Sequence, residues 1–128
     1  MATEMEHGAS LNRDISRAIV RLTHEYTGRG PTRSRTTING TLIVCLLEDT
    51  LTKGERVLAD KGNHDAVLAM RHQFQKAMRD EAIAEIERLT ERRVVSFMST
   101  NHIDPDLAAE LFVLDAPMNN SSNGAAEL

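Results

Sequence analysis

The 128-residue sequence contains no tryptophan, and aromatic residues make up only 3% of it. The core must therefore be built from aliphatic side chains, and the aromatic platforms on which proteins stack single-stranded nucleic acids are missing. The chain also lacks a basic excess, because its formal net charge is −4 and its pI is ≈ 5.7. These absences argue against nucleic acid as a partner.

Cysteines and long apolar runs are equally scarce. The single cysteine, Cys45, excludes an internal disulfide and any multi-cysteine metal site, and it fits a reducing compartment. No run approaches the ~20 apolar residues that cross a bilayer. Residues 1–6 have neither the basic start nor the apolar stretch of a signal peptide. The sequence therefore predicts a cytoplasmic protein without a membrane span.

The periodicity of the apolar residues predicts three helices and four strands. Helical spacing indicates helices over 10–27, 52–60 and 64–91, and alternation or β-branched runs indicate strands over 32–38, 42–47, 93–99 and 111–114. The order α-β-β-α-α-β-β is typical of an α+β domain, in which two hairpins form an antiparallel sheet packed with helices. We expect this single domain to span residues 10–115, between a flexible N-terminus (1–9) and a disordered C-terminal tail (116–128).

Glycine, proline and asparagine mark the ends of these elements. Gly28 and Pro31 predict the end of the first helix. Asn39-Gly40 predicts a type I′ hairpin turn, with positive φ at both central residues and Ile38 opposite Thr41. The strand after this turn is apolar on both faces, so it lies either centrally in a sheet covered on both sides or under a second copy of the chain. Because few aromatic residues are present to seal a monomer core, we expect a symmetric partner to cover part of the sheet. The expected assembly is a homodimer.

Two residues near the second helix and one on the third predict a buried contact. Thr52 and Glu55 have the spacing of a capping box. Arg71 lies on the apolar stripe of the long helix, where a guanidinium needs a buried partner. We expect a structural clamp with Glu55, or with a carbonyl of the 28–31 turn as the alternative. The competing interpretation is that Arg71 binds an external anion.

Arginines gather around the Gly28-Arg29-Gly30-Pro31 turn. A glycine-rich turn with nearby cations can hold phosphate, so the alternative function is an anion or phosphate site formed by Arg29, Gly30, Arg33, Arg35 and Arg71. The sequence has no Gly-Lys-Ser/Thr pattern, and these glycines follow a helix rather than a strand. Solvated arginines that protect a sheet edge explain the same cluster.

No pattern predicts catalysis, a metal site or a cofactor. The histidines at 7, 24, 64, 72 and 102 lack metal-ligand spacing. Cys45 lies within an apolar strand, where a thiol is unreactive. Ser96 and Ser99 have no recognisable histidine and aspartate partners. The sequence favours a non-enzymatic domain over an enzyme, although a site assembled across a dimer interface is the remaining enzymatic alternative.

The order and spacing of several short motifs resemble the MpsC-like family over residues 10–115. The motifs are Gly28-Arg29-Gly30-Pro31, Leu51-Thr52 with Glu55, Arg71, Ile86-Glu87, Arg93-Val94 and Ser96-Phe97. The chain departs from the family pattern at Glu91, where the family tends to carry glycine, and at Lys53-Gly54, where it carries a Pro-Ala-like pair.

This bacterial family, a domain of unknown function, is named after a component of a sodium-translocating, membrane-potential-generating system. The resemblance implies a small soluble domain with no established catalytic residues. It also implies a regulatory or accessory role beside an ion-transport system, with a protein partner at the membrane.

Overall fold

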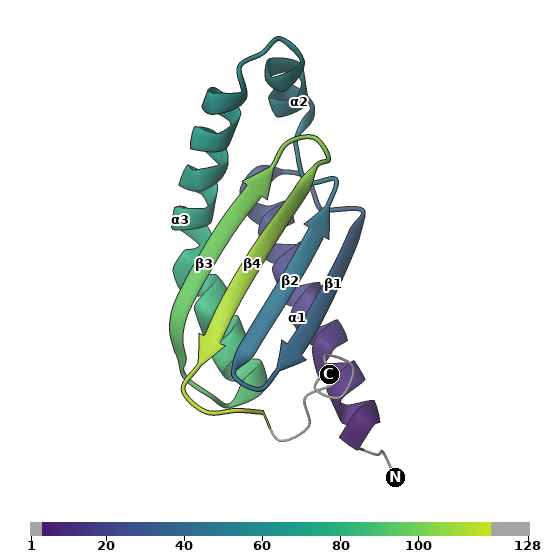
Figure 1. Cartoon of the computed structure of the whole chain (residues 1–128), viewed down its shortest axis with the longest axis vertical. Coiled ribbons are helices and arrows are strands. Elements are labelled where there is room, and N and C mark those ends of the chain that lie inside the picture. Colours follow the sequence, from purple (N-terminus) through teal and green to yellow (C-terminus); the bar gives the residue numbers. More distant parts are fainter. Residues whose placement is uncertain (1–3, 119–128) are drawn as a thin grey trace.

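The fold is an antiparallel sheet with helices on one side (Figure 1). The computed structural model describes residues 4–118. Its elements are α1 (Glu4–Thr27), β1 (Arg33–Asn39), β2 (Leu42–Glu48), α2 (Lys53–Asp60), α3 (His64–Thr90), β3 (Val94–His102) and β4 (Leu107–Leu114). The strands lie in the order β1-β2-β4-β3, and every neighbouring pair is antiparallel. This arrangement confirms the predicted α+β class and the order α-β-β-α-α-β-β.

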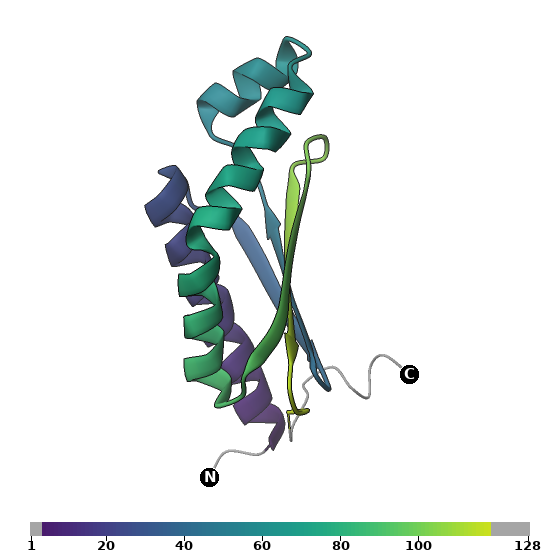
Figure 2. The ribbon, with the colours of Figure 1, turned by 90° about the vertical axis from the view of Figure 1, so that its left-hand side faces the viewer.

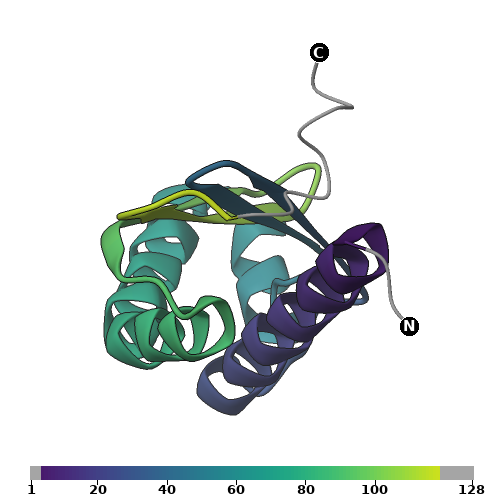
Figure 3. The ribbon, with the colours of Figure 1, turned by 90° about the horizontal axis from the view of Figure 1, so that it is seen from below.

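The molecule has two layers. Figures 2 and 3 show α1 and α3 side by side on one face of the sheet, and no helix or strand within residues 4–118 covers the other face. The core lies between the layers, where α1 and α3 meet the inward-facing side chains of the two central strands. Its buried members include Ile15, Ile19 and Leu22 of α1, Met78, Ala82 and Ile86 of α3, Ile43, Cys45 and Leu47 of β2, and Phe112 and Leu114 of β4.

The β1–β2 hairpin lies where Asn39-Gly40 predicts it, but the register differs from the prediction. Asn39 pairs with Leu42 and Ile38 with Ile43, so the two turn residues are Gly40 and Thr41. Gly40 has a φ of 62°, whereas Thr41 has no positive φ. One positive φ at the first turn residue is the pattern of a type II′ turn, which accepts a β-branched residue at the second position. The predicted type I′ turn is therefore wrong, although a shift of two residues leaves each side chain on its expected face.

The ends of several elements also differ from the prediction. α1 begins at Glu4 rather than at residue 10, and β4 begins at Leu107 rather than at Leu111. Residues 1–3 of the predicted flexible N-terminus and 119–128 of the predicted disordered tail lie outside the described residues, whereas 4–9 belong to α1. α3 ends at Thr90 and is followed by Glu91 in the left-handed conformation, with a φ of 55°. This is the position at which the resembled family tends to carry glycine.

α2 packs against the start of α3. Ala59 of α2, Val67 of α3 and Leu51 of the preceding loop form a smaller apolar cluster there. The predicted capping box is confirmed at its N-terminus. The Thr52 side chain accepts from the Glu55 amide, and the Glu55 carboxylate accepts from the Thr52 amide. The cap places Glu55 beneath the helix, where it faces α3.

Candidate functional site

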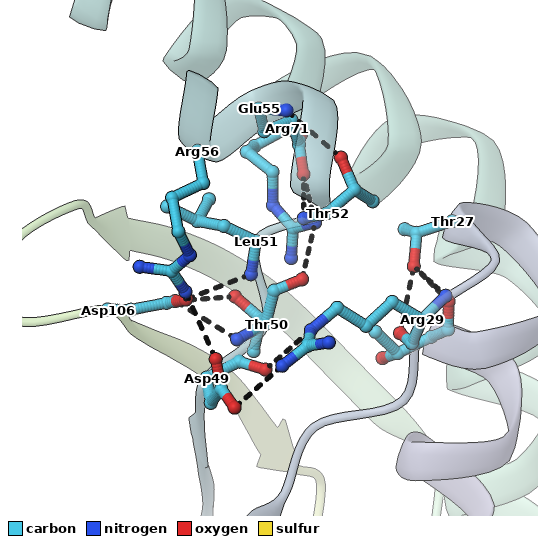
Figure 4. A network of polar contacts seen from close by, with 11 residues as sticks. Thr27, Arg29, Asp49, Thr50, Leu51, Thr52, Glu55, Arg56, Arg71 and Asp106 are labelled. Carbon is cyan, nitrogen blue, oxygen red and sulfur yellow. Dashed lines mark hydrogen bonds and ion pairs between the residues drawn. The ribbon is translucent and has the colours of Figure 1, made fainter. Parts of the chain in front are cut away.

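A buried ion pair joins α3 to the start of α2 (Figure 4). Arg71 is 3% exposed and Glu55 is 1% exposed. The Nη1 atom of Arg71 lies 3.4 Å from Oε1 of Glu55 and 3.4 Å from the carbonyl oxygen of Thr50. The predicted pairing of Arg71 with Glu55 is therefore confirmed, and the carbonyl that shares the guanidinium belongs to Thr50 rather than to the 28–31 turn.

Asp106 anchors the turn between β3 and β4 to the same segment. Its two carboxylate oxygens accept hydrogen bonds from the amides of Thr50 and Leu51, each at 3.0 Å, and from the Thr50 hydroxyl at 3.0 Å. Arg56 of α2 adds an ion pair to Asp106 at 2.9 Å. Asp106 was not predicted from the sequence. The available signal was an aspartate directly after Asp104-Pro105, since such turn residues often accept hydrogen bonds from backbone amides.

Arg29 reaches this network from the loop after α1. Its Nη2 atom lies 2.6 Å from Oδ2 of Asp49, and its Nε donates to the Asp49 carbonyl at 3.2 Å. Asp49 also pairs with Arg56 at 3.0 Å. Arg29, Asp49, Arg56 and Asp106 thus tie three loops together at one end of the sheet. These contacts indicate a structural function for Arg29.

The other predicted binding residues lie elsewhere. Gly30 packs beside His24 and Val20 of α1. Arg33 and Arg35 lie on β1, where Arg33 approaches Glu48 at 3.9 Å and Arg35 lines a groove beside α1. The structure therefore brings Arg29 and Arg71 to the same loop segment, where each forms an ion pair with a carboxylate. Of the four predicted arginines, Arg35 is the one that lines a surface groove.

A second buried carboxyl, Glu110, lies on the inward face of β4. It is 2% exposed and stands opposite Cys45 of β2 and Ser99 of β3. Burial raises its pKa from the ordinary 4.5 to about 7, and the Ser99 hydroxyl, the Arg71 charge and the Gln75 amide partly oppose that shift. Sequence reasoning missed Glu110; the available signal was a lone acidic residue at an inward position of an otherwise apolar strand.

A small cavity of ≈ 180 Å³ opens beside this carboxyl, between α3 and β3. Its lining is His72, Gln75, Lys76, Arg79, Phe97 and Ser99. Cys45, on the opposite side of Glu110, is fully buried, and desolvation raises the pKa of its thiol to about 12. This thiol is therefore protonated at neutral pH. No group of three or more potential metal-ligating side chains occurs within the described part of the chain.

The uncovered face of the sheet carries a continuous set of apolar side chains outside the core. We call it the open face. Its centre consists of alternate residues of β2 and β4, together with one methionine of β3: Leu42, Val44, Leu46, Leu107, Ala109, Leu111, Val113 and Met98. Leu42 is 37% exposed and Met98 is 50% exposed. Polar residues flank the centre, with Arg33, Arg35, Thr37 and Asn39 on β1 and Ser96, Thr100 and His102 on β3. Glu48, at the end of β2 between Arg33 and Leu107, is the charged residue of β2 on this face.

Comparison with known proteins places this chain in a family. No helix in residues 4–118 is long and apolar enough to cross a bilayer. No curated protein and no solved structure matches the sequence significantly. Residues 7–116, nearly the whole described chain, match the family described as "Na+-translocating membrane potential-generating system (MpsC)". The chain, with its buried Arg71–Glu55 pair and its one-sided sheet, belongs to the MpsC family.

Proposed function

We propose that this protein is a non-catalytic interaction domain that forms a homodimer through the open face and serves an ion-transport system as a regulatory accessory. The observation that carries the proposal is the one-sided packing of the sheet. Apart from Glu48 on the open face and Glu110 on the inward face, β2 and β4 carry apolar side chains on both faces. Among the described residues only the inward face is covered (Figure 2). Burial of the other face would remove further apolar surface from water, at about 25 cal/mol per Å².

The arrangement of the open face supports a protein partner. The side chains of its centre are uncharged. Its margin carries Glu48 at the end of β2, and its flanks carry arginine, threonine, asparagine, serine and histidine. An apolar centre with a polar rim is the usual anatomy of a protein–protein interface.

A second copy of the chain is the partner that fits this face directly. A two-fold axis through the centre would place the uncharged residues of β2 and β4 against their own counterparts, so no like charges would meet there. Two sheets stacked in this way lie about 10 Å apart and share one apolar layer. The family description supports the second part of the proposal, because it assigns the family to a Na+-translocating system.

Sedimentation equilibrium at micromolar concentration tests the dimer. We expect a mass of twice the 14.2 kDa chain, independent of salt, because the contact is apolar rather than ionic. Lysines at Met98 and Leu42 should return the protein to the monomer, since each would place a charge within the apolar contact. Met70→Lys is the matched control, because Met70 is 41% exposed on α3, away from the open face.

The accessory role is tested by affinity purification from membranes of the native host. We expect subunits of a transport system to co-purify with the wild type and the Met70→Lys control, and not with the Leu42→Lys/Met98→Lys variant. A monomer over the whole concentration range would contradict the dimer. Equal recovery of transport subunits by the two variants would contradict the role of the open face in that contact.

A further inference from the structure

A groove runs between α1 and the outer edge of β1. In Figure 1, the N-terminal half of α1 continues past β1 at the lower right of the sheet. The groove has a volume of ≈ 430 Å³, and its walls are Asn12, Arg13, Ser16 and Arg17 of α1 and 34–37 of β1. The sheet thus ends at β1, and α1 extends beyond that edge. A further strand could pair with β1 and lie against this part of α1.

β1 presents backbone hydrogen-bonding groups to this groove. The hydrogen bond from the Leu114 amide to the Thr41 carbonyl shows that odd-numbered residues of β2 bond to β4. Backbone hydrogen bonds alternate in direction along a strand, so the even-numbered residues of β2 bond to β1 instead. Their partners are the odd-numbered residues of β1 that lie opposite them. The amides and carbonyls of Ser34 and Thr36 consequently point to the outer edge, where none of residues 4–118 forms a strand beside them.

The groove is also positively charged. Arg13, Arg17 and Arg35 are exposed, and none of them forms an ion pair with a described residue. Seven other arginines form ion pairs within residues 4–118. Asp14 lies on the far flank of Arg17, in a different hollow. In a chain with a formal net charge of −4, three unneutralised arginines beside one strand edge form a local site for anions.

We propose that an extended acidic segment of a partner protein adds to β1 as a fifth strand. Its backbone pairs with Ser34 and Thr36. The carboxylates on one face of the added strand lie against Arg13 and Arg17 of α1, whereas Arg35 adds positive charge from the other face of β1. Strand addition supplies main-chain hydrogen bonds, while the charged side chains select the sequence that binds. This surface shares only Arg35 with the flank of the open face, so the inference goes beyond the proposed dimer and does not depend on it.

A second copy of β1 fits this edge poorly. Antiparallel pairing of two β1 strands about Thr36 would place Arg35 of each copy opposite Thr37 of the other and diagonal to its Arg35, on the same face. Like charges at such short range destabilise a strand pair. The charge of the groove therefore favours an acidic partner over self-pairing.

The test uses the full chain and a short, end-capped peptide of alternating valine and glutamate. The same peptide with lysine in place of glutamate is the comparison. We expect fluorescence anisotropy to detect binding of the acidic peptide alone. At saturation, the Ser34 and Thr36 amides should exchange with solvent at least about tenfold more slowly, because strand pairing protects them. Added salt should weaken the binding.

Two variants separate the charge from the backbone contribution. Arg13→Gln with Arg17→Gln should weaken peptide binding at least about tenfold, whereas Arg93→Gln, at an exposed arginine outside the groove, should leave it unchanged. Ser34→Pro removes an outward amide. Proline is tolerated on an edge strand when its nitrogen faces away from the neighbouring strand, so this variant should remain folded and lose binding.

The outcomes decide the proposal. Binding that is insensitive to the double arginine variant, or that leaves the exchange of the Ser34 and Thr36 amides unchanged, would overturn it. Tighter binding of a single-stranded oligothymidylate at the same arginines, without amide protection, would also overturn it in favour of a polyanion groove. If Ser34→Pro fails to fold, the exchange rates of the wild-type amides decide the question.

Discussion

The buried carboxyl of Glu110 makes a direct prediction about stability and pH. Its pKa is about 7 in the folded protein, against an ordinary value of 4.5, because burial disfavours the charged form. Between these two values the folded state holds a proton that the unfolded state has released. The free energy of unfolding should therefore fall as the pH rises from about 4.5 to about 7, and the stabilisation is fully present only below that window.

The size of the effect follows from the shift. The rise in the pKa of Glu110 corresponds to about 1.4 kcal/mol per pH unit. The free energy of unfolding should therefore fall by on the order of 3 kcal/mol between pH 4.5 and 7. Glu110→Gln keeps the shape of the side chain and removes the titration. We expect this variant to be more stable than the wild type at pH 8 by up to that amount, and to lack the slope between pH 4.5 and 7.

Urea denaturation at a series of pH values measures both quantities. Asp14→Asn, at an exposed carboxyl on α1, is the control and should leave the slope of the wild type in place. The reasoning is refuted if Glu110→Gln keeps the same dependence of unfolding free energy on pH. It is also refuted if Glu110→Gln is less stable than the wild type at pH 8.

Three further substitutions test the backbone and the buried ion pair. Glu91→Gly should raise the free energy of unfolding by about 1 kcal/mol, because glycine accepts the φ of 55° without a Cβ penalty; an unchanged melting temperature would argue against strain there. Gly40→Val should cost at least about 1 kcal/mol at a φ of 62°, although no atom lies within 4 Å of the added Cβ, and wild-type stability would count against the turn. Arg71→Met should cost roughly 3–5 kcal/mol by leaving Glu55 buried and unpaired. The double variant with Glu55→Gln should lose less than the sum of the single losses, and strict additivity in urea denaturation would show that the pair is not coupled.

Local chemistry made much of the fold predictable. Capping residues, helix-ending glycines and Asn39-Gly40 act through short-range rules, and they located the capping box, the helix ends and the hairpin. The ion pair of Arg71 was predictable for a different reason. A cation on the apolar stripe of a helix needs a buried partner, whichever part of the chain provides it.

The remaining features depend on long-range packing. Ala108-Ala109-Glu110 has little intrinsic strand propensity, and it forms β4 because β2 and β3 pair with it on both sides. The same pairing buries Glu110, so its raised pKa was not visible in the sequence. Asp106 was missed because the amides that it accepts belong to a loop more than fifty residues earlier in the chain. The two-faced apolar character of β2 predicted either a sheet covered on both sides or a second copy of the chain. Within residues 4–118 helices cover one face (Figures 2 and 3), so coverage of the other face by a second copy stays a prediction.

Exposure of two methionine methyl groups tests the central claim, that the open face is an interface between two copies. Met98 and Met70 are 50% and 41% exposed in the single chain, on opposite layers of the molecule. In protein carrying ¹³C-methyl methionine, a soluble paramagnetic probe should broaden the Met70 signal and spare that of Met98 at micromolar concentration. The two signals should broaden alike in the Leu42→Lys variant. Equal broadening in the wild type would contradict the account.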